Sequence, residues 1–309
     1  MIKIENLVKR YGSFVALDHL NLNIEEGEVF GLLGPNGSGK TTAINCLLSI
    51  LKYDKGTIEI FGKEMRPDCY EVKKDIGVVM QNVAVFEQMS VFENIDYFCG
   101  LYIKDREKKK QLVREAIKFV GLEGYEKMRP GKLSGGLLRR LNIACGIAHK
   151  PRLIIMDEPT VAVDPQSRNK ILEGIQELNR QGSTIIYTSH YMEEVEQICT
   201  RITIMDHGRA LATGTKEELK QMIKTGETVI IEAVILNEGQ LQSIRNLPHV
   251  FQVEYKEQIL KVKYNDGKHN LVRMLNYLQD AEVSFGRVFS ELPTLNDVFL
   301  EITGKELRD

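Results

Sequence analysis

Residues 34–42 read Gly-Pro-Asn-Gly-Ser-Gly-Lys-Thr-Thr and fill every fixed position of the phosphate-binding pattern G-x-x-x-x-G-K-[ST]. An apolar run at 29–33 precedes this loop, and apolar residues recur at i, i+3, i+4 and i+7 from Ile44. A glycine-rich turn between a strand and a helix lets backbone N–H groups converge on a polyphosphate, and the helix start adds partial positive charge. The sequence therefore predicts binding of a nucleoside triphosphate.

Within the loop, Lys40 is expected to reach the β- and γ-phosphates, and the Thr41 hydroxyl is expected to bind Mg²⁺. The other loop positions expected to contact the nucleotide are Asn36, Gly37, Ser38, Gly39 and Thr42.

Two carboxylates follow a second apolar run, at 153–156. A buried strand would hold Asp157 rigidly beside the metal, where it binds Mg²⁺ directly or through water. Glu158 is suited to polarising an attacking water. This pair predicts hydrolysis as well as binding.

Composition narrows the class of protein. The 309 residues suggest about two domains, and the net charge of −2 gives no reason to expect a nucleic-acid or anionic-membrane surface. The five cysteines are scattered and form no C-x-x-C pair, which favours reduced core cysteines over a disulfide frame or a metal site. No stretch approaches the roughly 18 consecutive apolar residues of a membrane span. The chain is therefore expected to be soluble, with any membrane part supplied by another subunit.

The order of strand and helix patterns predicts two domains, residues 1–222 and 223–309. In the first, a β-rich layer at the N-terminus is followed by alternating strands and helices, which predict an α/β fold with a mainly parallel sheet. Residues 216–225 are expected to form a linker. The second domain has the β-α-β-β-α-β order of the ferredoxin-like plait, with strands at 227–236, 250–255, 259–264 and 282–289 and helices at 238–246 and 267–280. A last helix is expected to be capped by Thr294.

A second glycine-bearing turn, Leu133-Ser134-Gly135-Gly136, precedes Asp157 and resembles the signature motif of ABC-transporter ATPases. The other motifs of that family follow in order over residues 1 to about 220. Tyr11 stands at the adenine-stacking position, Gln81 at the Q-loop, Asp164 at the D-loop and His190 at the H-loop.

The resemblance implies an ABC ATPase domain with a helical subdomain, and it implies ATP and Mg²⁺ as ligands. Gln81 would touch the metal site, and His190 would contact the γ-phosphate and the catalytic water. The residues Ser134, Gly135, Gly136 and Asp164 would complete the ATP pocket of an opposite subunit, because a serine and two glycines at a helix start form a second anion site. Two chains, or one chain and a second ABC ATPase, would then bind two nucleotides head to tail.

This sequence departs from the family pattern at two places. Leu137 stands in the signature motif where glutamine is commonest, and Val161-Ala162 opens the D-loop where serine and glycine are commoner. Neither change removes a phosphate ligand or the metal carboxylate. They bear on the rate of hydrolysis rather than on its existence.

The C-terminal tail, 292–305, resembles that of the daunorubicin-resistance type of ABC ATPase. This resemblance implies export driven through a separate membrane permease, with the chain on the inner face of the cell membrane and membrane contact only through that permease. Val83, Val85 or Phe86 is expected to line the cleft that receives the permease. The alternative is a soluble ABC ATPase of DNA repair or translation.

The role of the C-terminal domain is left open between bracing the ATPase dimer and binding a regulatory ligand. Nucleic-acid binding is disfavoured, because residues 224–309 hold 10 basic against 13 acidic residues.

Overall fold

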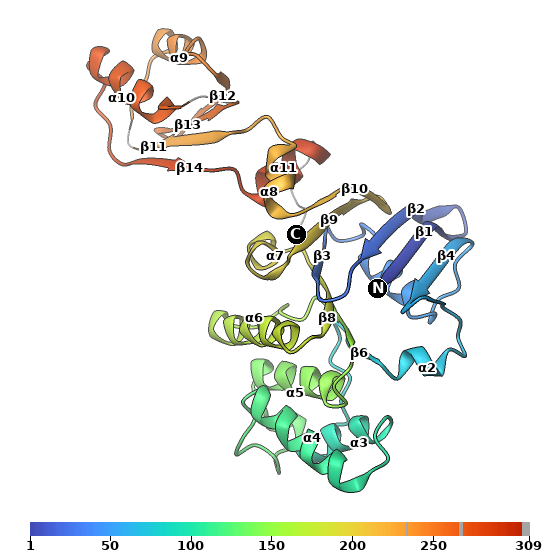
Figure 1. The fold of residues 1–309 in the computed structure, drawn as a ribbon. Coiled ribbons are helices and arrows are strands. Elements are labelled where there is room, and N and C mark those ends of the chain that lie inside the picture. The colour runs from blue at the N-terminus through green and yellow to red at the C-terminus, as the bar shows by residue number, and fades with distance from the viewer. Residues whose placement is uncertain (233, 266–267, 305–309) are drawn as a thin grey trace. The chain divides into compact units, whose positions relative to one another are not determined.

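The computed structural model describes residues 1–232, 234–265 and 268–304. The chain divides into two compact units, Met1–Thr215 and a second unit that begins at Lys216 (Figure 1). The expected boundary between residues 222 and 223 stays a prediction. Three residues of the expected elements lie outside the described residues: 233 in the strand 227–236, 267 in the helix 267–280 and 305 in the C-terminal tail.

The first unit is built on a six-stranded sheet in the order β10-β9-β3-β8-β7-β6. All neighbouring strands run parallel except β9 and β10. The strands are β3 (Val29–Leu33), β6 (Ile76–Val79), β7 (Leu153–Asp157), β8 (Thr184–Ser189), β9 (Arg201–Asp206) and β10 (Arg209–Gly214). Every residue of β3, β7 and β8 is buried, which agrees with their continuous apolar sequences and with helices on both faces.

A second sheet of four antiparallel strands forms the expected N-terminal layer, in the order β2-β1-β4-β5. Its strands are β1 (Ile2–Tyr11), β2 (Phe14–Ile24), β4 (Lys55–Ile60) and β5 (Lys63–Glu64). Helix α1 (Lys40–Leu47) shares one apolar core with both sheets: Ile44 packs in the same cluster as Leu20 of β2 and Ile155 of β7. The phosphate-binding loop is thus anchored through α1, the helix that follows it and packs in this core.

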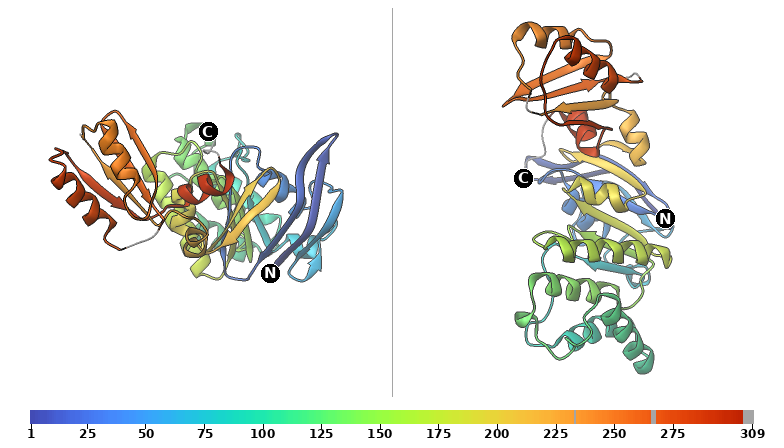
Figure 2. Two further views of the ribbon diagram at one scale, coloured as in Figure 1. Left: turned by 90° about the horizontal axis from the view of Figure 1, so that it is seen from above. Right: turned by 90° about the vertical axis from the view of Figure 1, so that its left-hand side faces the viewer.

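Two further helices, α6 (Pro165–Arg180) and α7 (Met192–Ile198), lie on the other face of the six-stranded sheet (Figure 2). Gly31 of β3 shows why α7 can lie so close. A Cβ at Gly31 would come within 2.9 Å of Cys199 Sγ and 3.0 Å of Val195 Cγ1. Phe30 and Leu32, its neighbours in β3, point into the opposite core with α1.

The helical subdomain comprises α3 (Val91–Gly100), α4 (Arg106–Phe119), the 3₁₀ turn η1 (Pro130–Lys132) and α5 (Gly135–Ile147). The short helix α2 (Tyr70–Lys73) lies outside it, because its Val72 packs in the core shared by the two sheets. Ser90 and Glu93 form the expected capping box of α3. Helix α5 packs on β6 through two glycines that permit close backbone contact. A Cβ at Gly77 would lie 2.3 Å from the Gly146 carbonyl oxygen, and one at Gly146 would lie 2.8 Å from that of Val78.

The second unit contains the expected plait, with sheet order β12-β13-β11-β14 and every pair antiparallel. Its strands are β11 (Glu227–Ile231), β12 (Val250–Lys256), β13 (Ile259–Tyr264) and β14 (Val288–Glu291), and its helices are α8 (Lys216–Gln221), α9 (Glu238–Arg245), α10 (Asn270–Asp280) and α11 (Leu295–Thr303). A separate core of Val229, Leu260, Met274 and their neighbours holds this unit together. The ferredoxin-like prediction is confirmed, as is the Thr294 cap of the last helix.

Three details of the predicted elements from residue 216 onward are wrong. The expected strand 227–236 ends at Ile231, as β11. The expected linker contains helix α8, since 216–221 consists of strong helix formers and Leu219 is fully buried. The expected strand 282–289 begins only at Val288. Glu282 has a left-handed backbone with φ +52°, which forms a turn after α10 instead of starting a strand.

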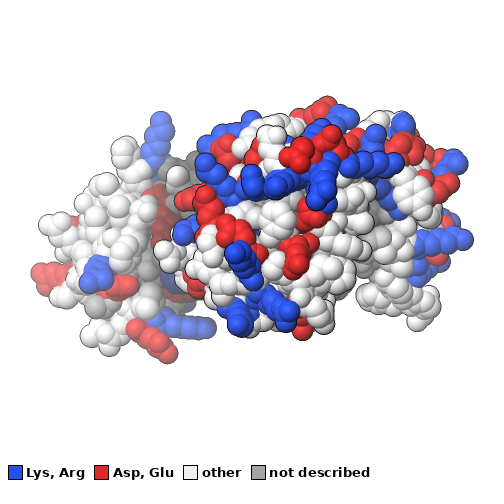
Figure 3. Space-filling model, turned by 90° about the horizontal axis from the view of Figure 1, so that it is seen from below, with Lys and Arg blue, Asp and Glu red and all other residues white. Residues whose placement is uncertain are grey.

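Among the described residues, no helix combines the length and apolarity needed to cross a membrane. On the face turned to the viewer in Figure 3, Lys and Arg side chains are interspersed with Asp and Glu.

His149 follows α5 and provides a pH-dependent term in stability. Its ring stacks on Tyr102 with centroids 4.0 Å apart, and its Nε2 lies 3.3 Å from the Ile76 carbonyl oxygen. Burial lowers the pKa of His149 to about 4 from its ordinary 6.5. The unfolded chain therefore binds this proton more readily, so the stability present above pH 6.5 is lost as the pH falls towards 4.

We predict that the free energy of unfolding falls by about 2 kcal/mol between pH 7 and pH 5 because of His149 alone. Urea unfolding at the two pH values should show this loss in the native chain and in His207→Gln, whose histidine is exposed. The loss should be absent in His149→Gln. The same pH dependence in all three proteins would contradict the assignment.

Candidate functional site

The candidate residues gather because parallel strands present their carboxyl ends at one edge of a sheet. The phosphate-binding loop leaves the end of β3, and Gln81 follows the end of β6. Asp157 ends β7 with Glu158 directly after it, and His190 directly follows β8. These four strands are consecutive in the order β3-β8-β7-β6, so their loops are neighbours.

The phosphate-binding loop has the backbone that its glycines permit. Gly37 and Gly39 have φ of +83° and +103°, and a Cβ at Gly39 would lie 2.8 Å from the Ala16 carbonyl oxygen. The Lys40 ammonium lies inside the loop, donating to the carbonyl oxygens of Gly34 at 2.7 Å and Pro35 at 3.2 Å. Ser38 is buried, and its Oγ has no hydrogen-bond partner. The loop thus carries a buried cation and an unsatisfied hydroxyl.

Thr41 and Asp157 meet directly, with the Thr41 hydroxyl donating to Asp157 Oδ2 at 3.0 Å. The second oxygen of this buried carboxylate accepts from Thr188 Oγ1 at 2.6 Å. Strand β8 thereby fixes the orientation of the Asp157 side chain. Hydroxyl and carboxylate oxygens held side by side are the donor set that Mg²⁺ prefers.

Three candidate side chains surround the carboxylate of Glu158. Lys40 Nζ lies 3.6 Å from Oε1, and Gln81 Nε2 donates to Oε2 at 3.3 Å. His190 Nδ1 lies 3.3 Å from Oε2, without the alignment of a hydrogen bond. Burial lowers the pKa of Lys40, while the charges of Glu158 and Asp157 act in the opposite direction. An ammonium, an amide and an imidazole thus lie within 3.6 Å of the two oxygens of one buried carboxylate.

The backbone at Glu158 is also unusual, with a left-handed φ of +46° in a residue that is not glycine. Its N–H donates to Thr188 Oγ1 at 2.9 Å. A non-glycine residue persists in this region only where its surroundings fix it, and such strain is common at functional sites.

In the part of the chain that the structure describes, none of the other candidates has a hydrogen bond or ion pair to the Glu158 carboxylate. Tyr11 ends β1 with its ring half exposed, and Asn36, Gly37 and Thr41 are also exposed. Gly39 and Thr42 are half-buried in the loop and the first turn of α1. Among the described residues, no hydrogen bond or ion pair joins 134–136 to the phosphate-binding loop.

The expected signature residues form the exposed start of α5. Ser134 caps this helix by accepting from the Leu137 N–H at 3.3 Å. A Cβ at Gly135 would meet nothing within 4 Å, so its surface is open. Gly136 is packed, because a Cβ there would lie 2.4 Å from Ser167 Oγ and 3.2 Å from Asp164 Oδ2. Asp164 in turn caps α6. The signature turn and the D-loop are therefore one surface of the chain.

Two buried charged residues were not expected from the sequence. Arg139 of α5 is only 4% exposed and donates to five backbone carbonyl oxygens around the site. Glu194 of α7 accepts from Tyr187 Oη at 2.6 Å and from Thr160 Oγ1 at 2.8 Å. The signal for Arg139 is its place three and four residues before Asn142 and Ile143, on the buried face of α5. No comparable signal marks Glu194.

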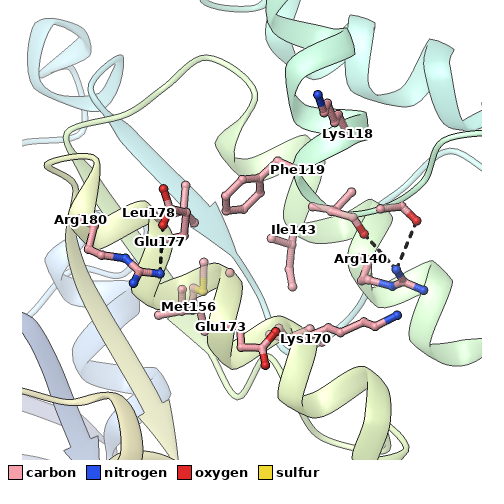
Figure 4. Close-up of a pocket in the computed structure, with 15 residues that line it drawn as sticks. Lys118, Phe119, Arg140, Ile143, Met156, Lys170, Glu173, Glu177, Leu178 and Arg180 are labelled. Carbon is pink, nitrogen blue, oxygen red and sulfur yellow. Dashed lines mark hydrogen bonds and ion pairs between the residues drawn. The ribbon is translucent and has the colours of Figure 1, made fainter.

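A separate cavity of about 540 Å³ lies between α4, α5 and α6 (Figure 4). Phe119, Ile143 and Met156 form its apolar part, and Arg140 donates from its rim to the Val120 and Gly121 carbonyl oxygens. None of the candidate residues is among its described lining residues, so this cavity is distinct from the phosphate-binding loop.

The sequence matches two known families in tandem: ABC transporter at residues 17–161 and ATP-binding protein DrrA1-3-like, C-terminal domain, at 214–303. It is 39% identical to the linearmycin resistance ATP-binding protein LnrL of Bacillus subtilis (strain 168), with all of both chains covered. It is 33% identical to the daunorubicin resistance ATP-binding protein DrrA3 of Streptomyces coeruleorubidus, over 99% of this chain and 97% of that protein. It is also 33% identical to the Nod factor export ATP-binding protein I of Rhizobium sp. (strain N33), over 99% and 98%.

Among solved structures, the fold resembles the dimeric bacterial ABC transporter cassette MJ0796, with a TM-score of 0.64 and 29% identity over 70% of this chain and 98% of that one. The sequence relatives are named as ATP-binding proteins, and the similar solved structure is an ABC transporter cassette. The chain belongs to the ATP-binding subunits of ABC transporters, and its second unit is the C-terminal domain of the DrrA-like members.

Proposed function

We propose that this chain binds Mg-ATP in the phosphate-binding loop, dimerises head to tail around two nucleotides and drives export through a separate membrane permease. The observation that carries the proposal is the group around Glu158, where Lys40, Gln81 and His190 all lie within 3.6 Å of one buried carboxylate.

Lys40 supports polyphosphate binding at this loop. Its ammonium is buried and donates to the carbonyl oxygens of Gly34 and Pro35 in the loop itself. Because burial disfavours its charged form, an incoming phosphate anion is the natural counter-charge. The exposed ring of Tyr11 is available to stack on adenine, with the N–H groups of 36–42 facing the phosphates.

Glu158 is proposed as the general base that takes a proton from the attacking water. Gln81 and His190 flank the same carboxylate oxygen, so a water bound there could be held by three side chains. His190 would orient this water and contact the γ-phosphate rather than act as the base. Mg²⁺, when bound by Thr41, Gln81 and Asp157, would neutralise charge on the phosphate oxygens.

The signature turn is proposed to bind the nucleotide of a second subunit. Gly135 is open, and the start of the 13-residue helix α5 presents N–H groups to an anion. Ser134, Gly136 and the neighbouring Asp164 complete this surface. Similarity to a cassette described as dimeric supports the arrangement, with the partner a second copy or a related ATPase.

An exposed aromatic group in the helical subdomain is proposed to dock the permease. Phe86 is 41% exposed and packs edge to face on Tyr97 at 5.0 Å and stacks near Phe98 at 5.8 Å. Val83 is also exposed, whereas Val85 is half-buried. Large exposed aromatic side chains gathered in this way mark interaction sites. The chain would then lie at the inner face of the cell membrane through this contact.

The names of the relatives favour export over a role in DNA repair or translation. Two are resistance ATP-binding proteins, for linearmycin and daunorubicin, and a third is a Nod factor export ATP-binding protein. We infer outward transport of a compound by the permease that this chain serves. The second domain, proposed as residues 223–309, would brace the ATPase dimer.

Glu158→Gln is predicted to lower ATP turnover at least about 100-fold, since the general base is removed while the carboxylate's shape is kept. ATP should still bind with a Kd within a few-fold of the native value. Steady-state hydrolysis and fluorescent-nucleotide titration measure the two effects. Retained turnover would show that Glu158 is not the base.

Gly135→Asp is predicted to abolish ATP-dependent dimerisation and lower turnover about 100-fold, because a carboxylate at the helix start repels phosphate. Nucleotide binding by the monomer should persist. The matched control is Gly131→Asp, where a Cβ also meets nothing within 4 Å. Equal rates of ATP hydrolysis in the two variants would contradict the proposal that the signature turn binds the nucleotide of a second subunit.

Phe86→Glu is predicted to release the chain from its permease while ATP hydrolysis by the isolated chain stays within about twofold of native, since a charge is placed in an apolar contact. Co-purification from membranes measures the complex. Tyr70→Glu is the control, because Tyr70 of α2 is also an exposed aromatic side chain, at 75% against 41% for Phe86. If the complex with the permease persists in Phe86→Glu, the permease does not dock at Phe86.

A further inference from the structure

Arg139 lies in the signature helix, but its contacts reach the catalytic edge of the sheet. Its Nε donates to the Pro159 carbonyl oxygen at 2.6 Å. One terminal nitrogen donates to the carbonyl oxygens of Met80 at 3.0 Å and Gln81 at 2.7 Å. The other donates to Glu158 at 2.7 Å and to Asp157 at 3.5 Å. The guanidinium thus joins the segment after β6 to the segment after β7.

These contacts hold the backbone of the residues that act on water. The Glu158 carbonyl belongs to the peptide that follows its left-handed φ, and Thr188 holds the N–H on the other side. The Gln81 carbonyl is fixed by the same guanidinium. Arg139 therefore sets the relative position of two side chains that meet at Glu158 Oε2.

The helix that carries Arg139 is itself firmly placed. Gly146 packs against Gly77 and Val78 of β6, and Asn142 accepts from the Ala84 N–H at 3.0 Å. Arg139 continues this buried face by one turn towards the helix start. The start of the same helix is the turn Ser134–Gly136. One rigid helix hence connects that turn to the backbone of Glu158.

We propose that Arg139 is a positioning residue for hydrolysis: it fixes Glu158 and Gln81 relative to the signature helix without touching nucleotide. This inference rests on the proposed function. Five directed N–H donors on a planar fork are specific to arginine, whereas lysine offers a single ammonium that cannot span five carbonyl oxygens. Charge alone is therefore insufficient at this position.

The test compares Arg139→Lys with Arg140→Lys. The neighbouring Arg140 belongs to the same helix and also donates to backbone carbonyl oxygens, but those of Val120 and Gly121 next to α4 (Figure 4). For Arg139→Lys we expect kcat to fall ~10- to 100-fold, the cost of a misplacement near 1 Å, with the ATP Kd within about twofold of native. Arg140→Lys should keep a near-native kcat.

Two further readouts separate positioning from a general structural defect. In the Glu158→Gln background, Arg139→Lys should still dimerise with ATP and should lower residual turnover no further, since both changes act on the same base. Arg139→Ala should regain turnover in millimolar guanidinium, far below the molar range that unfolds proteins, but not in equal sodium chloride.

Native kcat in Arg139→Lys would overturn the inference. So would unfolding of both Arg139 variants while Arg140→Lys stays folded, because Arg139 would then be structural only. Absence of ATP hydrolysis by the native chain would instead refute the proposed function, so the two failures are distinguishable.

Discussion

The ion pair between Lys40 and Glu158 is the interaction on which the site depends. Both side chains are buried and their charged atoms lie 3.6 Å apart. An isolated charge in such a position would be costly, and removing either partner leaves the other uncompensated. Under the proposed function, a bound polyphosphate takes over as the counter-charge of Lys40. The Glu158 carboxylate is then free to accept a proton from water.

The architecture makes this exchange possible because each partner comes from a different strand of one parallel sheet. Lys40 follows β3, Glu158 follows β7 and His190 follows β8, so no single loop has to supply the constellation. The buried strands fix the backbone, and polar side chains fix the rest: Thr188 orients Asp157 and Glu158, and Arg139 holds the carbonyl oxygens beyond β6 and β7. The strained φ of Glu158 persists within this framework.

Much of this arrangement could be predicted from the sequence, because the informative residues stand where chain direction changes. A glycine-rich turn after one apolar strand and two carboxylates after another predict which edge of the sheet binds nucleotide, and the β-α-β-β-α-β order of elements predicts the plait of the second unit. What could not be predicted depends on three-dimensional neighbours. The helical spacing of Arg139 from Asn142 and Ile143 places it on one face with them, but only the packing of α5 on β6 shows that its guanidinium is buried. Helix α8 falls in the expected linker, because it has one buried residue, Leu219, and packs against α11, which is distant in sequence.

The central claim is that each nucleotide is held by the phosphate-binding loop of one copy and the signature turn of another. The most direct measurement mixes two inactive variants, Lys40→Ala and Gly135→Asp, and follows ATP hydrolysis. Random pairing gives mixed dimers with one intact composite site, so the account predicts recovery towards about a quarter of native activity. A mixture no more active than its separate components would contradict a site shared between two chains.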